Sequence, residues 1–148
     1  GIDEGALGPG IALRMAVQPA GSDDAQRMRR GTPYVAGDTL LFRYDTRTSD
    51  AHPGELALVR VDADGATVLH TQDAQDGTAD LQTVAGVFGY ELETGETASV
   101  YALVRHDQMP DRGALEAALS VEVDVDAVCA AARQLGARCA AERVEEVR

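Results

Sequence analysis

The stretch from Gly37 to Thr71 constrains the fold of this chain more than any other, because it holds three strand patterns in succession. In the first pattern, the apolar side chains Leu40, Phe42 and Tyr44 occupy alternate positions. Successive side chains of a strand point to opposite faces, so this alternation places one face in a core and the other toward water. The first pattern therefore predicts a half-buried β-strand.

The second and third patterns together predict an antiparallel hairpin. Residues 56–61, LALVRV, are almost all apolar, as in a strand that is covered on both faces. The turn sequence Asp62-Ala63-Asp64-Gly65 follows, in which glycine adopts a positive φ easily and aspartate binds nearby backbone amides. Residues 66–71 then return as the partner strand.

Strand patterns also occur outside this stretch, in residues 11–17, 83–93 and 98–106. The segment 83–93 can form one or two short strands, and its glycines Gly86 and Gly89 indicate a bend or a close approach of two backbones. Residues 19–37 are expected to form a loop or one helical turn capped by Ser22 or Asp23, and residues 72–82 a polar connection. Several short strands separated by turn residues are typical of an antiparallel sandwich or barrel.

The hydrophobic pattern changes from a strand period to a helical period after Pro110. Proline in a first turn favours a helix, here over residues 113–120. A second helix is expected to be capped by Asp124 or Asp126 and to stop at Gly136. Residues 140–148 follow as a short final strand.

These patterns predict a mainly β fold: an antiparallel β-sandwich, immunoglobulin-like, with two C-terminal helices. Residues 1–10, GIDEGALGPG, are expected to form a flexible N-terminal segment, and residues 11–148 a single sandwich domain. Because aromatic residues make up only 4% of the chain and Trp is absent, we expect aliphatic side chains to supply the core.

The chain is strongly acidic, with a formal net charge of −12. This charge argues against binding to nucleic acid or to an anionic membrane surface, where cationic side chains must displace counterions. All 13 basic residues are Arg, whereas Lys and Asn are absent. Since the codons of Lys and Asn are AT-rich, this bias indicates a GC-rich bacterial genome. No segment contains the about 20 consecutive apolar residues that cross a bilayer.

Cys129 and Cys139 are the only cysteines and lie across the predicted end of the second helix. A disulfide requires Cα atoms about 4.4–6.8 Å apart, and a turn at Gly136 permits that approach. We expect a disulfide rather than two separate buried thiols. A redox site is disfavoured because the spacing is not Cys-x-x-Cys. A disulfide would place the domain outside the cytoplasm.

The residue types that carry catalysis do not form a recognisable motif. Among the three histidines, His70 and His106 end predicted strands and could meet in space, whereas His52 lies in a loop. A zinc site needs three or four convergent ligands, which this spacing does not indicate. The serines show neither a nucleophile elbow nor a neighbouring histidine. The sequence therefore predicts no catalytic residue, no cofactor and no enzyme activity.

The acidic clusters are Asp62 with Asp64, and Asp73 with Asp76 and Asp80. Calcium takes several carboxylate and carbonyl oxygens, and the D-x-D-G sequence resembles the beginning of a calcium loop. No Glu follows at the distance that such a loop requires, and turn chemistry accounts for these residues fully. We therefore expect solvated turns and no metal site.

Three segments in order, GDTLLFRYDT, GELALVRVDADGATVLH and ASVYALVRHDQMP, resemble a bacterial domain of unknown function. The residues that carry the resemblance are Gly37, Asp38, Leu40, Phe42, Leu56, Val61, Asp62 and Gly65. That domain is typical of large envelope proteins of myxobacteria, some of which carry an anti-sigma-factor zinc finger, and related domains accompany caspase-like peptidases. The resemblance covers about residues 11–147 and implies an immunoglobulin-like sandwich outside the membrane. It carries over no catalytic residues.

We therefore expect a non-enzymatic sensory or protein-interaction module of a bacterial envelope or signalling protein. Its expected location is periplasmic or extracellular, as the ectodomain of a larger protein; a cytoplasmic location is the alternative. The expected partner is a protein, without nucleic acid and without direct membrane contact by this segment. The alternative functions are a binding module for carbohydrate or another small ligand, and a hydrolase.

Overall fold

The computed structural model describes residues 11–27, 34–46, 54–145 and 147. The predicted flexible segment, residues 1–10, lies outside the described residues. Strands make up 50% of the structure, the sheets are antiparallel, and two helices accompany them. The prediction of a mainly β, antiparallel fold with two C-terminal helices is confirmed.

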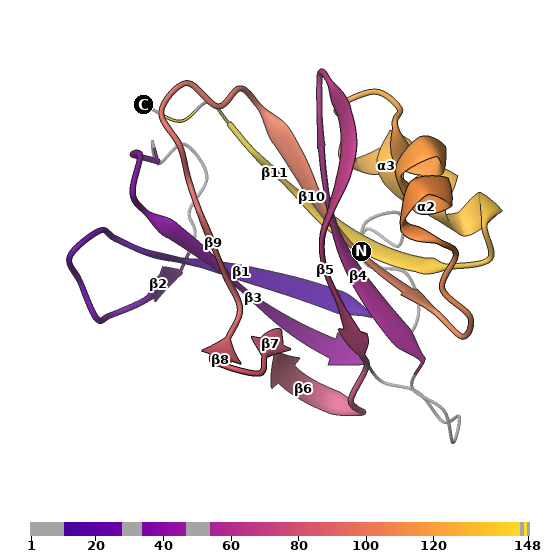
Figure 1. Cartoon of the computed structure of the whole chain (residues 1–148), viewed down its shortest axis with the longest axis horizontal. Helices are drawn as coiled ribbons and strands as arrows, with labels where there is room; N and C mark the ends of the chain where they lie inside the picture. Colours follow the sequence, from indigo (N-terminus) through magenta and orange to yellow (C-terminus); the bar gives the residue numbers. More distant parts are fainter. Residues whose placement is uncertain (1–10, 28–33, 47–53, 146, 148) are drawn as a thin grey trace, which may run out of the picture.

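The strands form two main sheets (Figure 1). The first sheet has the order β2–β1–β3–β6, and β9 also pairs with β3. Its strands are β1 (Ala12–Gln18), β2 (Gln26–Arg27), β3 (Thr39–Thr46), β6 (Gly77–Asp80) and β9 (Gly89–Glu91). The second sheet has the order β11–β10–β4–β5. Its strands are β4 (Glu55–Asp62), β5 (Gly65–Asp73), β10 (Ser99–His106) and β11 (Arg138–Val144). A small separate ladder joins β7 (Gln82–Thr83) to β8 (Gly86–Val87).

A buried core joins the two sheets face to face. The predicted inward residues of β3, Leu40, Phe42 and Tyr44, are at most 1% exposed and lie in this core. The core holds or contacts every aromatic residue of the chain: Tyr34, Phe42, Tyr44, Phe88, Tyr90 and Tyr101. Most buried members of this core are nevertheless aliphatic, as expected. The few aromatic rings are concentrated in one place, where they contact one another across the sheets.

A second core, which contains no aromatic residue, lies on the other face of the second sheet. The helices α2 (Arg112–Leu119) and α3 (Val125–Gln134) cover this face (Figure 1). Alternate residues of β4 divide between the two cores, because Leu56 and Leu58 face the first sheet whereas Val59 faces the helices. This double burial explains the almost wholly apolar sequence of β4.

The second helix begins and ends as its sequence predicts. The carboxylate of Asp124 caps it by accepting a hydrogen bond from the Ala127 amide at 2.9 Å. After its last turn, Gly136 adopts a φ of +81°, and the Ala137 amide donates to the Ala132 carbonyl. This stop turns the chain directly into β11.

Helix α2 also closes part of the free edge of β5. The Ala66 amide donates to Ser120 Oγ at 3.0 Å, and the Val68 amide donates to Glu116 Oε2 at 2.8 Å. Unpaired amides at a sheet edge are otherwise open to pairing with another strand. Two side chains at the end of α2 therefore take the place of a neighbouring strand.

Two segments differ from their predictions. Residues 72–82 are not only a polar connection, because β6 lies within them and pairs with β3 from Arg43 to Thr46. The sequence of β6, GTAD, shows no apolar alternation because none of its four residues is fully buried. Within the described part of residues 19–37 there is no helical turn; a turn stabilised by Ser22 leads into β2 instead.

The positive φ of Gly65 yields a testable prediction for the β4–β5 hairpin. Gly65 has a φ of +123°, and a Cβ atom there would lie 3.1 Å from Ser120 Oγ. We expect Gly65→Val to lower the free energy of unfolding by more than about 1 kcal/mol. Urea denaturation measures this change.

The matched control is Gly113→Ala in α2, where φ is not positive and a Cβ would meet nothing within 4 Å. Alanine favours a helix over glycine by about 1 kcal/mol, so this variant should be at least as stable as the native chain. An unchanged denaturation midpoint for Gly65→Val would contradict the hairpin geometry.

Candidate functional site

The predicted disulfide is present in the structure. Cys129 of α3 and Cys139 of β11 are bonded, with their Cα atoms 5.3 Å apart. Both cysteines are fully buried in the helix-facing core. The bond therefore fastens α3 to the edge strand of the second sheet across the turn at Gly136.

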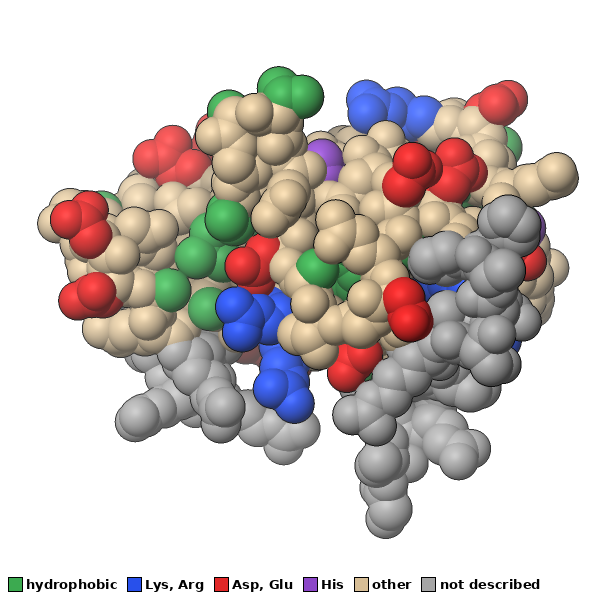
Figure 2. All heavy atoms as spheres, turned by 90° about the horizontal axis from the view of Figure 1, so that it is seen from below, with side chains coloured by type: hydrophobic (Ala, Val, Ile, Leu, Met, Phe, Trp, Pro, Cys, Tyr) green, Lys and Arg blue, Asp and Glu red, His purple; other side chains and the backbone are tan. Residues whose placement is uncertain are grey.

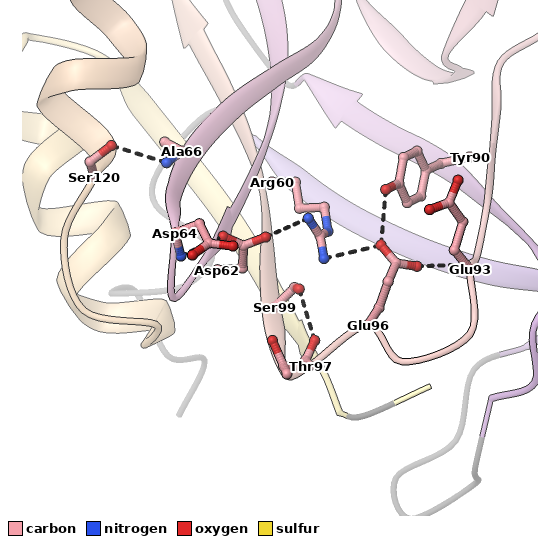
Figure 3. Close-up of polar contacts among 10 residues, drawn as sticks. All are labelled: Arg60, Asp62, Asp64, Ala66, Tyr90, Glu93, Glu96, Thr97, Ser99 and Ser120. Atoms are coloured by element: carbon pink, nitrogen blue, oxygen red, sulfur yellow. Dashed lines mark hydrogen bonds and ion pairs between the residues drawn. The ribbon is translucent and has the colours of Figure 1, made fainter. Parts of the chain in front are cut away.

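A network of charged side chains occupies one end of the space between the sheets (Figure 3). Arg60 of β4 is its centre: Nη1 pairs with Asp62 Oδ2 at 2.5 Å, and Nη2 pairs with Glu96 Oε1 at 3.0 Å. The three side chains are only 12–17% exposed. One guanidinium thus holds two carboxylates, in the fork geometry that Arg provides.

Glu96 extends this network to the other sheet. Its Oε1 accepts a hydrogen bond from the Tyr90 hydroxyl at 3.0 Å, and its Oε2 accepts one from the Glu93 amide at 2.8 Å (Figure 3). Tyr90 belongs to β9 in the first sheet, whereas Arg60 belongs to β4 in the second. The network therefore ties the two sheets and the loop before β10 together.

Tyrosine hydroxyls near this network are shielded from water. Burial raises the pKa of Tyr101, which pairs with Arg60 across the ladder, and the nearby Arg60 charge offsets only part of that rise. Burial also raises the pKa of Tyr90. Both carboxylates of the network already have cationic or hydrogen-bonding partners. The arrangement is suited to holding the end of the sandwich together rather than to transferring protons.

The predicted turn chemistry accounts for Asp62 and Asp64. Asp62 Oδ1 accepts a hydrogen bond from the Asp64 amide at 2.8 Å, while its Oδ2 is engaged by Arg60. Both carboxylate oxygens of Asp62 therefore already have partners within the chain. Among the described residues, no group of three or more His, Cys, Asp or Glu side chains could hold a metal ion.

The structure does not bring the histidines together. His70 lies within β5 rather than at its end, stacks on the Phe88 ring at 4.7 Å between centroids and hydrogen-bonds to Gln72. His106 donates from Nε2 to the Leu135 carbonyl at 2.8 Å and accepts the Gln108 amide at Nδ1. The idea that the two could meet was wrong, because each has separate partners. His52 lies outside the described residues.

The outer face of the first sheet differs from that of the second in what packs on it. Helices cover the outer face of the second sheet, but no described helix or strand packs on the outer face of the first. The strand register places Ala16 opposite Leu41, with Gly89 beside Leu41. The next row pairs Arg14 with Arg43, and Arg43 with Asp80. We call this surface, formed by the water-facing residues of β1, β3, β6 and β9, the open face.

The β7–β8 ladder adds exposed apolar side chains to the same side of the molecule. Val84 at its turn is fully exposed, and Val87 of β8 is 52% exposed. Figure 2 shows hydrophobic side chains gathered next to basic ones on this side, and others at the tip of a protrusion. The prediction of short strands at residues 83–93 is confirmed. At Gly89 the close neighbour is a side chain rather than another backbone, since a Cβ there would lie 2.6 Å from Thr39 Cγ2.

Sequence reasoning missed the open face. Arg14, Ala16, Leu41 and Arg43 come from two strands whose sequences show only which residues alternate. Their relation to one another depends on the pairing register, which the sequence does not display. The presence of Leu41 among the water-facing positions of β3 was the one local indication of an apolar outer surface.

Comparison with known proteins adds no further support for a function. No family model, no curated protein and no solved structure matches the chain. Within the described residues, no helix is both long enough and apolar enough to span a membrane.

The buried disulfide predicts a measurable gain in stability. Closing a loop between cysteines ten positions apart should contribute about 2–3 kcal/mol. We therefore expect a reducing agent to lower the melting temperature, and the double variant Cys129→Ala, Cys139→Ala to melt at a similarly reduced temperature without responding to the agent. Two thiols reactive in the native, unreduced protein would contradict the bond.

The raised pKa of Tyr101 predicts a loss of stability at alkaline pH. The folded state holds the phenolic proton more tightly than the unfolded state, where the pKa is about 10. The resulting contribution to stability is complete below about pH 10 and is lost as the pH rises through the raised pKa. Denaturation midpoints measured at increasing pH should therefore fall above about pH 10. The fall should be shallower in Tyr101→Phe, which has no phenolic proton; equal slopes would contradict the assignment.

Proposed function

We propose that this domain is a non-enzymatic protein-interaction module, of the immunoglobulin-like sandwich type, in a bacterial envelope or signalling protein. The observation that carries the proposal is the contrast between its two sheets. In the second sheet, β4 and β10 are buried on both faces, whereas the open face of the first sheet combines the partly exposed Leu41 and Ala16 with charged side chains. Exposed apolar side chains that are rimmed by polar residues are typical of protein-binding surfaces.

An extracytoplasmic location fits the same proposal. The disulfide between Cys129 and Cys139 closes in the fully buried helix-facing core. Disulfides of this structural kind persist in oxidising compartments and are rare in the cytosol. We therefore propose that the domain works in the periplasm or outside the cell, as a sensory or binding part of a larger protein.

The carbohydrate-binding alternative has less support in the structure. Small-ligand sites are lined mainly by hydrophobic and aromatic side chains around a few polar groups. All six aromatic side chains of this chain belong to or pack against the inter-sheet core. The open face therefore offers aliphatic and charged groups, which suit a protein surface better than a sugar ring.

The hydrolase alternative likewise lacks a nucleophile and base in contact among the described residues. The hydroxyls of Ser22, Ser99 and Ser120 each donate to a backbone carbonyl. A nucleophilic serine needs a base within hydrogen-bonding reach, and the described histidines have other partners.

Selection from a random-peptide display library tests the interaction function. We expect the domain to enrich peptides that compete with one another for one site. Their affinity should fall about tenfold in the variant Leu41→Ser, Val87→Ser, because the variant removes apolar contact at the open face and at β8 on the same side of the molecule. Equilibrium binding to immobilised domain measures the change.

Val121→Ser provides the matched control, because Val121 is also an exposed valine but follows α2 on the other side of the molecule. Its affinity for the selected peptides should equal that of the native domain. Failure to enrich any specific peptide would contradict an interaction module, and equal binding by all variants would place the site elsewhere.

A further inference from the structure

Two arginines face each other across the open face. The register of β1 and β3 places Arg14 directly opposite Arg43, and both side chains are exposed. Like charges in directly opposed positions of a sheet repel each other. Arg43 is neutralised in part, since its Nε donates to Asp80 Oδ1 at 2.9 Å. Arg14 forms no hydrogen bond or ion pair with any described residue. Within the described part of the chain, a guanidinium without a partner therefore lies beside a second one in a protein of net charge −12.

The neighbouring row of residues on the same face consists of an apolar side chain, Leu41, between two small residues. Ala16 lies two residues after Arg14 on β1 and is opposite Leu41, which is followed across the sheet by Gly89. Ala16 and Leu41 are only partly buried. Because these side chains are short or absent on both sides of Leu41, a partner can approach the sheet closely at this row.

The other charges on the face leave Arg14 as the available cation. The acidic side chains of the open face are Asp80, Asp45 and Glu91. Asp80 holds Arg43, and Asp45 already takes part in an interaction of its own. Glu91 lies beyond the apolar row, opposite Thr39. A ligand carboxylate can therefore reach Arg14 without displacing an existing ion pair in the described chain.

We propose that the open face binds an acidic segment of a partner protein, a refinement that depends on the proposed interaction function. A carboxylate of the segment pairs with Arg14, and an apolar side chain two residues away covers Ala16 and Leu41. Guanidinium and carboxylate groups form charge-assisted hydrogen bonds in a fork geometry. At physiological ionic strength, charges are screened over about 8 Å, so Arg14 can attract a nearby carboxylate although the whole protein is acidic.

A defined peptide tests the proposal directly. The probe is the peptide acetyl-Gly-Ser-Glu-Ser-Leu-Ser-Gly-amide, in which the acid and the apolar residue are two positions apart, and its partner carries Gln in place of Glu. Titration into isotope-labelled domain should shift amide resonances of β1 and β3 first. Arg14→Ala should weaken binding of the Glu peptide about fivefold and leave binding of the Gln peptide nearly unchanged, as a coupled pair requires.

Arg112→Ala is the matched control, since Arg112 is exposed at the start of α2 and its loss changes the net charge equally. This variant should bind the Glu peptide like the native domain. Arg14 is exposed and opposed by a like charge, so its removal should leave the melting temperature intact, which a thermal scan checks.

The outcomes separate this proposal from the broader one. Equal weakening by Arg112→Ala, no weakening by Arg14→Ala, or no binding of the Glu peptide would overturn the acidic-segment proposal. Resonance shifts confined to another surface would overturn it as well, while leaving an interaction module in place. Only failure of the random-peptide selection bears against the interaction function itself.

Discussion

Burial of the second sheet on both of its faces is the constraint on which the rest of the structure depends. In β10, seven consecutive residues from Ser99 to Arg105 are buried, so this strand contacts the first sheet on one side and the helices on the other. Apolar burial drives folding in proportion to the area removed from water. A strand with no water-facing side therefore anchors both cores. The first sheet, in contrast, has an outer face on which no described helix or strand packs.

The charged network between the two sheets is governed by the cost of removing charges from water and the gain from pairing them. Charges removed from water are unfavourable unless they are paired and hydrogen-bonded. Arg60 meets this condition at Nη1 and Nη2 through two carboxylates, whereas its buried Nε has no hydrogen-bond partner among the described residues. Glu96 also binds the Tyr90 hydroxyl and the Glu93 amide. Apolar contacts alone do not fix how the two sheets are oriented, because they have no preferred direction. The bonds of the network form only when β4, β9 and the loop between β9 and β10 are correctly placed, so the network favours one arrangement of the sheets.

Local sequence patterns were enough to predict much of the fold. Alternation in β1 and β3, the Asp-Gly turn of the hairpin, and the Asp124 cap and Gly136 stop of α3 all involve residues near one another in sequence. The disulfide followed from the same stop. These features depend on short-range backbone chemistry, which a single sequence displays directly.

The features that could not be predicted depend on contacts between distant segments. The strand β6 forms because β3 offers it an edge, not because GTAD favours a strand. The concentration of six aromatic rings in one core, and the opposition of Arg14 and Arg43, both require the pairing register. The open face could therefore not be predicted from the sequence, because its residue types are common and only the pairing register brings them together.

The capping of β5 by α2 has a consequence for assembly. Ser120 and Glu116 occupy the amides through which a further strand would join that edge near the hairpin. Extension of the second sheet by another copy is thus directed to β11, its opposite border. A sheet with one free edge can pair edge to edge with one other copy. A sheet with two free edges could add further copies and continue as a fibre. The side chains of Glu116 and Ser120 thereby disfavour strand addition at the hairpin end of β5.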